Sequence, residues 1–318
     1  MKVLIFEYIT ASGGVSESLQ REGQMMLDAL LKNFERIPTI EVVIATVANF
    51  QNKLKMVDAA WLIAPEFDGI LQHYCELVES ANKILLTSSS KAVALTANKL
   101  TTFQILHAAK IQTVPTEIFD SSKNYDATRE WIIKPIDGAG AENTFLLQSK
   151  KDWSSLPYFE KTVLIQPHIC GEKLSLSCIF KNGVARLLCV NLQVFDIENQ
   201  QYVLQNIDVN FKQDDGHYQT LVSHIAAAFP DLFGYVGIDL IENEKACFVL
   251  EINPRLTTSF VGIENALGLN VAECVLQSFE SNLFISKPHF NFLNGMRRFQ
   301  ITKATIHPTT IWIHFFRR

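Results

Sequence analysis

Three side chains that offer oxygen ligands stand close together within residues 235–258, YVGIDLIENEKACFVLEINPRLTT. The pattern predicts a strand carrying Asp239, a polar turn, and a second strand carrying Glu251 and Asn253. Residues two apart on a strand point to the same face. A turn of three residues (243–245) would place Asp239 on that face too, whereas a turn of even length would not. Carboxylate and amide oxygens without Cys or His suit Mg²⁺ or Mn²⁺ rather than zinc, so the sequence predicts such a metal site here.

A basic strand followed by a loop of small residues predicts a phosphate site earlier in the chain. Mg²⁺ is usually bound by one or two carboxylates together with substrate phosphates, which implies a nucleotide site. Lys134 lies within the apolar pattern WIIKPID, and GAGAENT, residues 138–144, follows it. An unpaired ammonium on such a strand is costly, and a loop of this kind can bring backbone N–H groups close to an anion. The combination favours phosphate binding over an ordinary hairpin whose lysine reaches solvent.

Three further charged residues are candidates for the same site. Lys99 opens a helix that Asn98 caps, where a positive charge opposes the helix dipole, so it is either a solvated surface residue or an anion ligand. Glu172, on the turn after the strand pattern of residues 163–168, is either a contact for ribose hydroxyls or an acidic surface residue. Arg255 follows the hairpin across a proline, which fixes the backbone and projects the guanidinium near the metal site.

The elements that position these candidates change character along the chain. In the N-terminal part, short apolar strands alternate with helices, which indicates a parallel sheet with ligand loops at the carboxyl ends of its strands. Strands are expected there at residues 1–9, 41–47, 59–64 and 84–86, helices at 16–31 and 70–80, and a loop at 10–14. Further on, helices are expected at 98–109, 218–229 and 263–277, and strands at 131–137, 163–168 and 187–194. Residues 281–318 are either a peripheral strand or partly disordered.

Composition limits the class of protein. The chain has 318 residues, 48% hydrophobic and 19% charged, an ordinary globular composition with room for two or three lobes. A net charge of −5 gives no reason to expect nucleic acid or an anionic membrane as a partner. The six cysteines lack metal-type spacing and fit reduced thiols. Neither a signal peptide nor a membrane-spanning run is apparent, so a cytoplasmic protein is expected.

The candidates occur in the order found in a known superfamily. NKLTTFQILHAA, IIKPIDGAG, LIQPHICGEKLSLS, GYVGIDLI and LEINPRLTTS resemble the ATP-grasp superfamily, over residues 98–272. The resemblance implies ATP held between two α+β subdomains and a carboxylate activated as an acyl phosphate before a nucleophile attacks it. The implied fold is α/β (α+β), with a Rossmann-like pre-ATP-grasp domain in front. The implied domains are residues 1–95, 96–170 (small ATP-grasp subdomain), 171–280 (subdomain with the metal site) and 281–318, a tail of unclear structure.

The resemblance also implies a role for each candidate. The implied ATP contacts are Lys99, Lys134, Gly138, Gly140, Gln166, Pro167, His168, Ile169 and Glu172. In that set the lysines bind phosphates, the glycine loop closes over them, residues 167–169 line the adenine pocket, and Glu172 contacts the ribose. The implied Mg²⁺ ligands are Asp239, Glu251 and Asn253, and the implied catalytic residues are Arg255 and Lys134. Many family members carry the ribose glutamate one position later, where this chain has Lys173.

One branch of the superfamily resembles the chain over a longer stretch. FEYITASGG, REGQMMLDALL, IAPEFDGIL, SSSKAVALTANK, DVNFK and EINPRLTTS are similar to the archaeal-type tyramine–L-glutamate ligases of methanofuran biosynthesis, over about residues 1–275. That branch implies small-molecule substrates, with glutamate and tyramine joined into γ-glutamyltyramine. Another amino-acid or dipeptide ligase of this fold stays open as an alternative, as does an ATP-binding protein without chemistry. A homo-oligomer is compatible with each of these.

Overall fold

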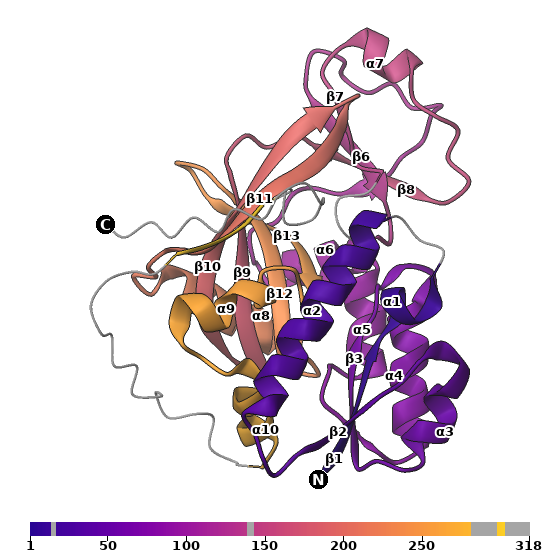
Figure 1. Cartoon of the computed structure of the whole chain (residues 1–318). Helices are drawn as coiled ribbons and strands as arrows, with labels where there is room; N and C mark the ends of the chain where they lie inside the picture. The colour runs from indigo at the N-terminus through magenta and orange to yellow at the C-terminus, as the bar shows by residue number, and fades with distance from the viewer. Residues whose placement is uncertain (14–16, 139–142, 281–297, 303–318) are drawn as a thin grey trace.

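The N-terminal part of the chain forms a small parallel sheet in the computed structural model, which describes residues 1–13, 17–138, 143–280 and 298–302 (Figure 1). Its strands are β1 (Lys2–Glu7), β2 (Glu41–Ile44), β3 (Ala59–Ile63) and β4 (Ile84–Leu85), paired in the order β2-β1-β3-β4. All three pairings are parallel. β3, AAWLI, is buried along its whole length, as expected of a parallel strand with both faces covered.

Helices cover both faces of this sheet. α2 (Glu17–Glu35) packs on one face through Met26 and Leu30, while α3 (Phe50–Leu54) and α4 (Ile70–Ser80) pack on the other. The remaining N-terminal elements are α1 (Tyr8–Ser12), the 3₁₀ turns η1 (Val47–Asn49) and η2 (Phe67–Gly69), and α5 (Ser90–Ala97). The carboxyl ends of β1 and β3 lead into α1 and η2, so these short elements lie at the edge of the sheet where its strands end. Ligands usually bind at this edge in such folds, and we call it the ligand edge.

A larger antiparallel sheet occupies the rest of the described chain. Its strands are β5 (Glu117–Ile118), β6 (Trp131–Pro135), β7 (Phe145–Leu147), β8 (Val163–Pro167), β9 (Glu172–Lys181), β10 (Val184–Glu198), β11 (Gln201–Lys212), β12 (Gly234–Glu242), β13 (Cys247–Asn253) and β14 (Phe299–Thr302). They run in the order β13-β12-β9-β10-β11-β7-β6-β8-β5, and β14 pairs with β11. The accompanying helices are α6 (Lys99–Ala108), α7 (Lys150–Ser154), α8 (His217–Ala228), α9 (Phe260–Leu267) and α10 (Val271–Glu280).

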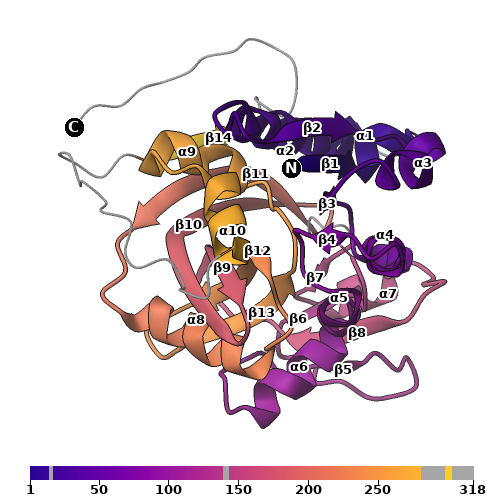
Figure 2. The same cartoon turned by 90° about the horizontal axis from the view of Figure 1, so that it is seen from below.

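The two sheets share one hydrophobic core. Met26 of α2 and Trp61 of β3 belong to the same buried cluster as Phe260 and Ile263 of α9 and Val275 of α10. Seen from below, α10 lies between the small sheet and the curled large sheet, and α8 covers the outer face of the large one (Figure 2). The N-terminal sheet is therefore packed against the large sheet, which fixes the position of its ligand edge.

Most of the predicted elements are found, and the predicted mixed α/β class is confirmed. Three expectations were wrong. Residues 10–14 were expected to form a loop, but residues 8–12 form α1, because the Glu7 carboxylate accepts hydrogen bonds from the backbone N–H groups that begin this helix. The single helix expected at 263–277 is two helices, since Gly268 takes a left-handed conformation with φ 68° and ends α9. The third, a turn in the predicted metal hairpin, is described with the site.

The C-terminal prediction is tested only in part. In the segment 281–318, residues 298–302 are described, and β14 there is a peripheral strand on β11. The rest of that segment lies outside the described residues. All six cysteines are free thiols. Among the described residues, none of the helices has the length and apolarity needed to cross a membrane.

Candidate active site

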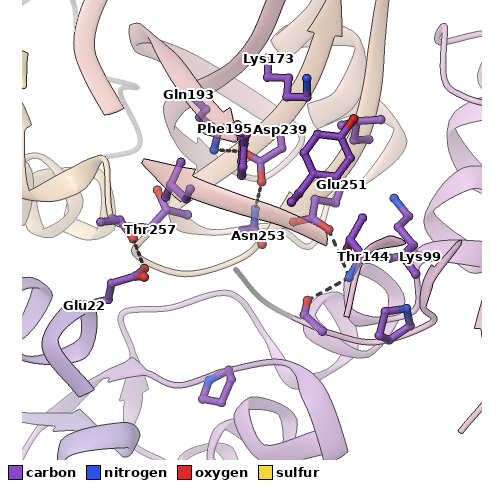
Figure 3. A pocket seen from close by; sticks show the side chains of 18 of the residues that line it. Glu22, Lys99, Thr144, Lys173, Gln193, Phe195, Asp239, Glu251, Asn253 and Thr257 are labelled. Atoms are coloured by element: carbon purple, nitrogen blue, oxygen red, sulfur yellow. Dashed lines mark hydrogen bonds and ion pairs between the residues drawn. The ribbon is translucent and has the colours of Figure 1, made fainter. Parts of the chain in front are cut away.

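A pocket lies between the ligand edge of the small sheet and the concave side of the large one (Figure 3). It brings together eleven of the sequence-predicted site residues: Lys99, Lys134, Gly138, Gln166, Pro167, His168, Ile169, Asp239, Glu251, Asn253 and Arg255. Two predicted residues are not among them. Gly140 lies outside the described residues. Glu172 is half exposed and pairs with Lys212 at 3.3 Å, and its neighbour Lys173 lines the pocket instead.

The β12–β13 hairpin has the predicted arrangement of side chains, but its turn and its strand register differ from the prediction. The turn comprises residues 243–246, not the expected three, and this even length alone would place Asp239 opposite Leu250. A β-bulge shifts the register by one residue, so Asp239 lies opposite Glu251 instead. Leu250 is the additional residue, and it lines the pocket. Asp239, Glu251 and Asn253 consequently face the same pocket, as the sequence predicts.

Two carboxylates therefore lie side by side in a buried setting. Asp239 accepts hydrogen bonds from Asn253 Nδ2 at 3.0 Å and from Gln193 Nε2 at 3.1 Å. Burial, together with the charge of Glu251, raises the pKa of Asp239. Burial opposes ionisation of Glu251 as well, but the positive charges of Lys99 and Lys134 outweigh it and lower the pKa of Glu251. Two adjacent carboxylates with an amide side chain beside them form a donor set that suits a divalent cation.

The two lysines predicted to bind phosphate stand beside this acid pair. Lys99 Nζ is 3.2 Å from Glu251 Oε2 and donates to the carbonyl of Gly138 at 2.9 Å. Its side chain is 10% exposed, which rules out a solvated surface residue. Asn98 caps α6 by accepting from the N–H of Thr101. Burial lowers the pKa of Lys134 to about 8, although the negative charge of Glu251 acts to raise it. Buried ammonium groups of this kind are ready partners for an anionic ligand.

Arg255 is held by a residue that the sequence analysis missed. Its Nε and Nη2 donate to Glu66 Oε2 at 2.9 and 2.8 Å, and its Nη1 donates to the carbonyl of Leu256 at 3.0 Å. Both side chains are nearly enclosed, with Glu66 5% and Arg255 11% exposed. Glu66 lies three residues after the strand at residues 59–63, at the carboxyl end where ligands usually bind, so a signal for it was available in the sequence.

Apolar side chains also line the part of the pocket near residues 166–169. Ile132, Pro167, Ile169, Ile241 and Leu250 contribute there, and Gln166 is fixed by donating to Thr116 at 2.6 Å. His168 lies between two partners, with Nδ1 2.6 Å from Glu130 Oε2 and Nε2 3.0 Å from the Tyr202 hydroxyl. The Lys173 ammonium lies 5.0 Å from the centre of the Tyr202 ring. An apolar slot with a few fixed polar groups can accept a heteroaromatic ring.

Comparison with known protein families matches residues 96–259 to the ATP-grasp domain and residues 25–93 to the pre ATP-grasp 3 domain. The chain belongs to the ATP-grasp family. The family resemblance and the ATP-grasp fold predicted from the sequence are thereby confirmed. Members of this family bind ATP together with divalent metal ions.

Similar proteins extend the comparison along most of the chain. A tyramine–L-glutamate ligase of Methanocaldococcus jannaschii is 29% identical, over 82% of this chain and 84% of that protein. Among solved structures, an ATP-grasp superfamily protein from Archaeoglobus fulgidus has a TM-score of 0.68 at 24% identity, covering 87% of this chain and 88% of its own. D-alanine–D-alanine ligase from Bacillus anthracis has a TM-score of 0.64 at 15% identity, with 87% and 95% covered. Both structures share the ATP-grasp fold with this chain.

Proposed function

We propose that this ATP-grasp protein joins the γ-carboxylate of L-glutamate to tyramine, with ATP cleaved to ADP and phosphate, as in methanofuran-type cofactor biosynthesis. The observation that carries the choice of substrates is the identity with a named tyramine–L-glutamate ligase along 82% of the chain. The observation that supports the reaction type is a single pocket that combines an acid pair with buried lysines and an arginine. We also propose the domain division at residues 1–95, 96–170 and 171–280, and a cytoplasmic location.

The acid pair and Asn253 are proposed to hold the divalent metal. Their donor set consists of carboxylate and amide oxygens, which fits Mg²⁺, or Mn²⁺, better than a softer ion. The raised pKa of Asp239 beside Glu251 fits the same assignment, because a bound cation would favour the ionised form of Asp239. Mg²⁺ bound there would offset the charge of the β- and γ-phosphates of ATP.

The nucleotide is proposed to lie along the lysines and the apolar slot. Lys99 and Lys134 contact its phosphates, and the loop that begins at Gly138 and includes Gly140 covers them. Gln166 and residues 167–169 line the adenine site. We do not extend the ribose contact to Glu172, because that side chain pairs with Lys212 away from the pocket lining.

The chemistry proceeds in two steps in this proposal. A carboxylate oxygen of glutamate attacks the γ-phosphorus in line, the bond to the β-phosphate oxygen breaks, and ADP leaves. Lys134 and Arg255 stabilise the charge that develops on the phosphoryl oxygens. The ammonium form of the amine passes one proton to a carboxylate of the pocket, and the neutral amine then attacks the acyl carbon. The C–N bond forms, the C–O bond to phosphate breaks, and the departing phosphate takes a second proton of the amine. Exclusion of water protects the acyl phosphate between the steps.

A coupling assay tests this proposal. Phosphate release and product mass are followed with ATP, Mg²⁺ and glutamate, with and without tyramine, and γ-glutamyltyramine is the expected product. Glu251→Gln is expected to lower turnover by at least a hundredfold while circular dichroism and thermal unfolding show an intact fold. Release that needs a different acid and amine would favour another amino-acid or dipeptide ligase. ATP bound stoichiometrically without ADP formation across an acid and amine panel would leave only a binding protein.

A further inference from the structure

We infer that the half of the pocket walled by the N-terminal sheet, the acceptor compartment, is the amine site, and that Glu22 holds the ammonium group there and excludes acceptors that carry a carboxylate. The inference rests on the proposed ligase function, since it assigns the second substrate to a part of the same pocket. The acceptor compartment is lined by Glu7, Ile9, Leu19, Glu22, Gly23, Met26, Ile63, Phe67, Thr257 and Thr258.

The acceptor compartment lies on the opposite side of Asn253 from Lys99 of the proposed nucleotide half (Figure 3). In Figure 3, Asn253 stands between Glu22 and Thr257 on one side and Glu251 and Lys99 on the other. A reactive carboxyl group at the centre would therefore be approached by ATP from one side and by the amine from the other. This placement matches what the two successive attacks require.

The walls of the acceptor compartment are mostly apolar. Ile9 comes from α1, Leu19 and Met26 from α2, and Ile63 and Phe67 from the carboxyl end of β3 and the turn after it. These side chains come from elements that the shared core holds in place. They can take an apolar or aromatic body that a purely polar site would not favour.

The charges in this half are negative. Glu22 Oε2 accepts from the Thr258 hydroxyl at 2.7 Å, which joins α2 to the segment after the hairpin. Glu7 also lines the compartment, but its carboxylate is engaged by the backbone N–H groups of Ile9 and Thr10 at 3.1 and 2.6 Å. Glu22 is half-buried and reaches the pocket from a helix that is fixed in the core. It is therefore the acid best placed for an ammonium ligand.

Positive charge is correspondingly scarce there. Among the described residues that line the pocket, Lys99, Lys134 and Lys173 come from α6, β6 and β9, on the nucleotide side. The positive charge of Arg255 reaches this compartment, because it acts on Glu7, but Arg255 also pairs with Glu66. An amino-acid acceptor would bring a further carboxylate beside Glu22 and Glu7, where Arg255 is shared with Glu66, and like-charge contacts cost several kcal/mol. An amine without a carboxylate avoids this cost.

Tyramine and L-tyrosine form the matched pair of acceptors that tests the inference, because they differ by one carboxylate. Ethanolamine is a second comparison acceptor, because it has an amine but no aromatic or other large apolar group. With the full-length protein, ATP, Mg²⁺ and glutamate, tyramine should exceed each of the other two in kcat/KM by at least a hundredfold. Glu22→Gln should raise the KM for tyramine at least tenfold while the KM values for ATP and glutamate change less than twofold. Asp28→Asn, an exposed acid on the same helix, is the matched control and should change none of them.

Thr258→Val provides a second variant that leaves the Glu22 charge in place. It removes the hydroxyl that positions the carboxylate, so it should raise the KM for tyramine in the same direction but by less. Direct titration of tyramine into the protein loaded with a non-hydrolysable ATP analogue gives a readout independent of turnover. Glu22-dependent binding of tyramine without any coupling would refute the ligase function and leave the amine site standing. Equal use of L-tyrosine, a Glu22→Gln effect on the KM for glutamate instead of the amine, or tyramine binding unchanged by Glu22→Gln would overturn the inference.

Discussion

The ion pair between Arg255 and Glu66 joins the segment after β13 to the N-terminal sheet, and Glu66→Gln should destabilise the protein strongly. At the 2.8 Å separation of the pair, the attraction between two unit charges at an effective dielectric of 20 is about 6 kcal/mol. Desolvation of both groups offsets part of it. Removing one partner of a buried pair nevertheless costs about 3–5 kcal/mol, because the remaining charge stays buried alone. The carboxylates of Glu251 and Asp239 also attract Arg255, so the lower end of that range, about 3 kcal/mol, is expected.

Urea unfolding followed by fluorescence measures this effect. The series comprises Glu66→Gln, Arg255→Gln and the double variant, and coupling should make the double variant clearly more stable than the sum of the single effects predicts. Asp68→Asn is the matched control. Asp68 lies two residues from Glu66 and pairs with Lys161, but the side chains of both Asp68 and Lys161 are more than half exposed. The free energy of unfolding is therefore expected to fall by at most about 1 kcal/mol. A Glu66→Gln variant no less stable than this control, or strictly additive single effects, would refute the buried-pair reasoning.

Three further predictions concern the metal, a helix contact and an acid outside the site. Chelation with EDTA should abolish turnover and added Mg²⁺ should restore it; activity that persists in EDTA would contradict the metal assignment. Gly23→Ala should lower the free energy of unfolding by about 1–3 kcal/mol, because its Cβ would lie 2.8 Å from the enclosed Glu7 carboxyl, and unchanged thermal unfolding would show that this carboxyl moves aside. Burial opposes ionisation of Glu242, but hydrogen bonds from Lys212 and Tyr218 outweigh it and lower its pKa. Because the pKa of Glu242 is lower in the folded state, the ionised group stabilises the fold when the pH is above its pKa in the unfolded chain. This stabilisation is lost as the pH falls. Glu242→Gln should therefore cost about 1.5–3 kcal/mol at pH 7 and less below about pH 4, compared by urea midpoints at both values.

The β12–β13 hairpin and the buried lysines could be predicted because their signals are local. Glu251 and Asn253 are two residues apart on one strand, and Lys134 is a charge within an apolar pattern, so period and polarity were sufficient. The helix at residues 70–80 is found with the predicted bounds. Asp239 lies on the predicted face of the hairpin, although the predicted length of the turn was wrong. A β-bulge at Leu250 compensates the even turn, and a bulge has no reliable mark in a single sequence.

The contacts that the sequence did not predict join residues that are far apart in the chain. Glu66 and Arg255 are 189 positions apart, and Glu22 and Thr258 are 236 apart, so only the packing of the two sheets brings them together. Glu172, the predicted ribose contact, is not among the residues that line the pocket, for a different reason. Its side chain lies on the outer face of β9 with Lys212, whereas the alternation of the strand turns Lys173 to the pocket. Gly268 was visible in the sequence, but a single glycine within an apolar helical pattern does not by itself indicate where one helix ends.

The short segment after β13 connects the two halves of the proposed reaction. Asn253, the last residue of β13, contacts Asp239 in the proposed metal site, Arg255 follows it and pairs with Glu66, and Thr258 contacts Glu22 in the proposed acceptor compartment. Leu256, between them, is fully buried in the shared core, so the segment cannot shift at one end without disturbing the other. A substitution at the Glu66 end should consequently alter the KM for the amine as well as turnover with ATP. In the proposed reaction, the N-terminal part of the chain therefore does more than close the pocket, because Glu66 and Glu22 hold the proposed phosphate and amine ends of this segment in a fixed relation.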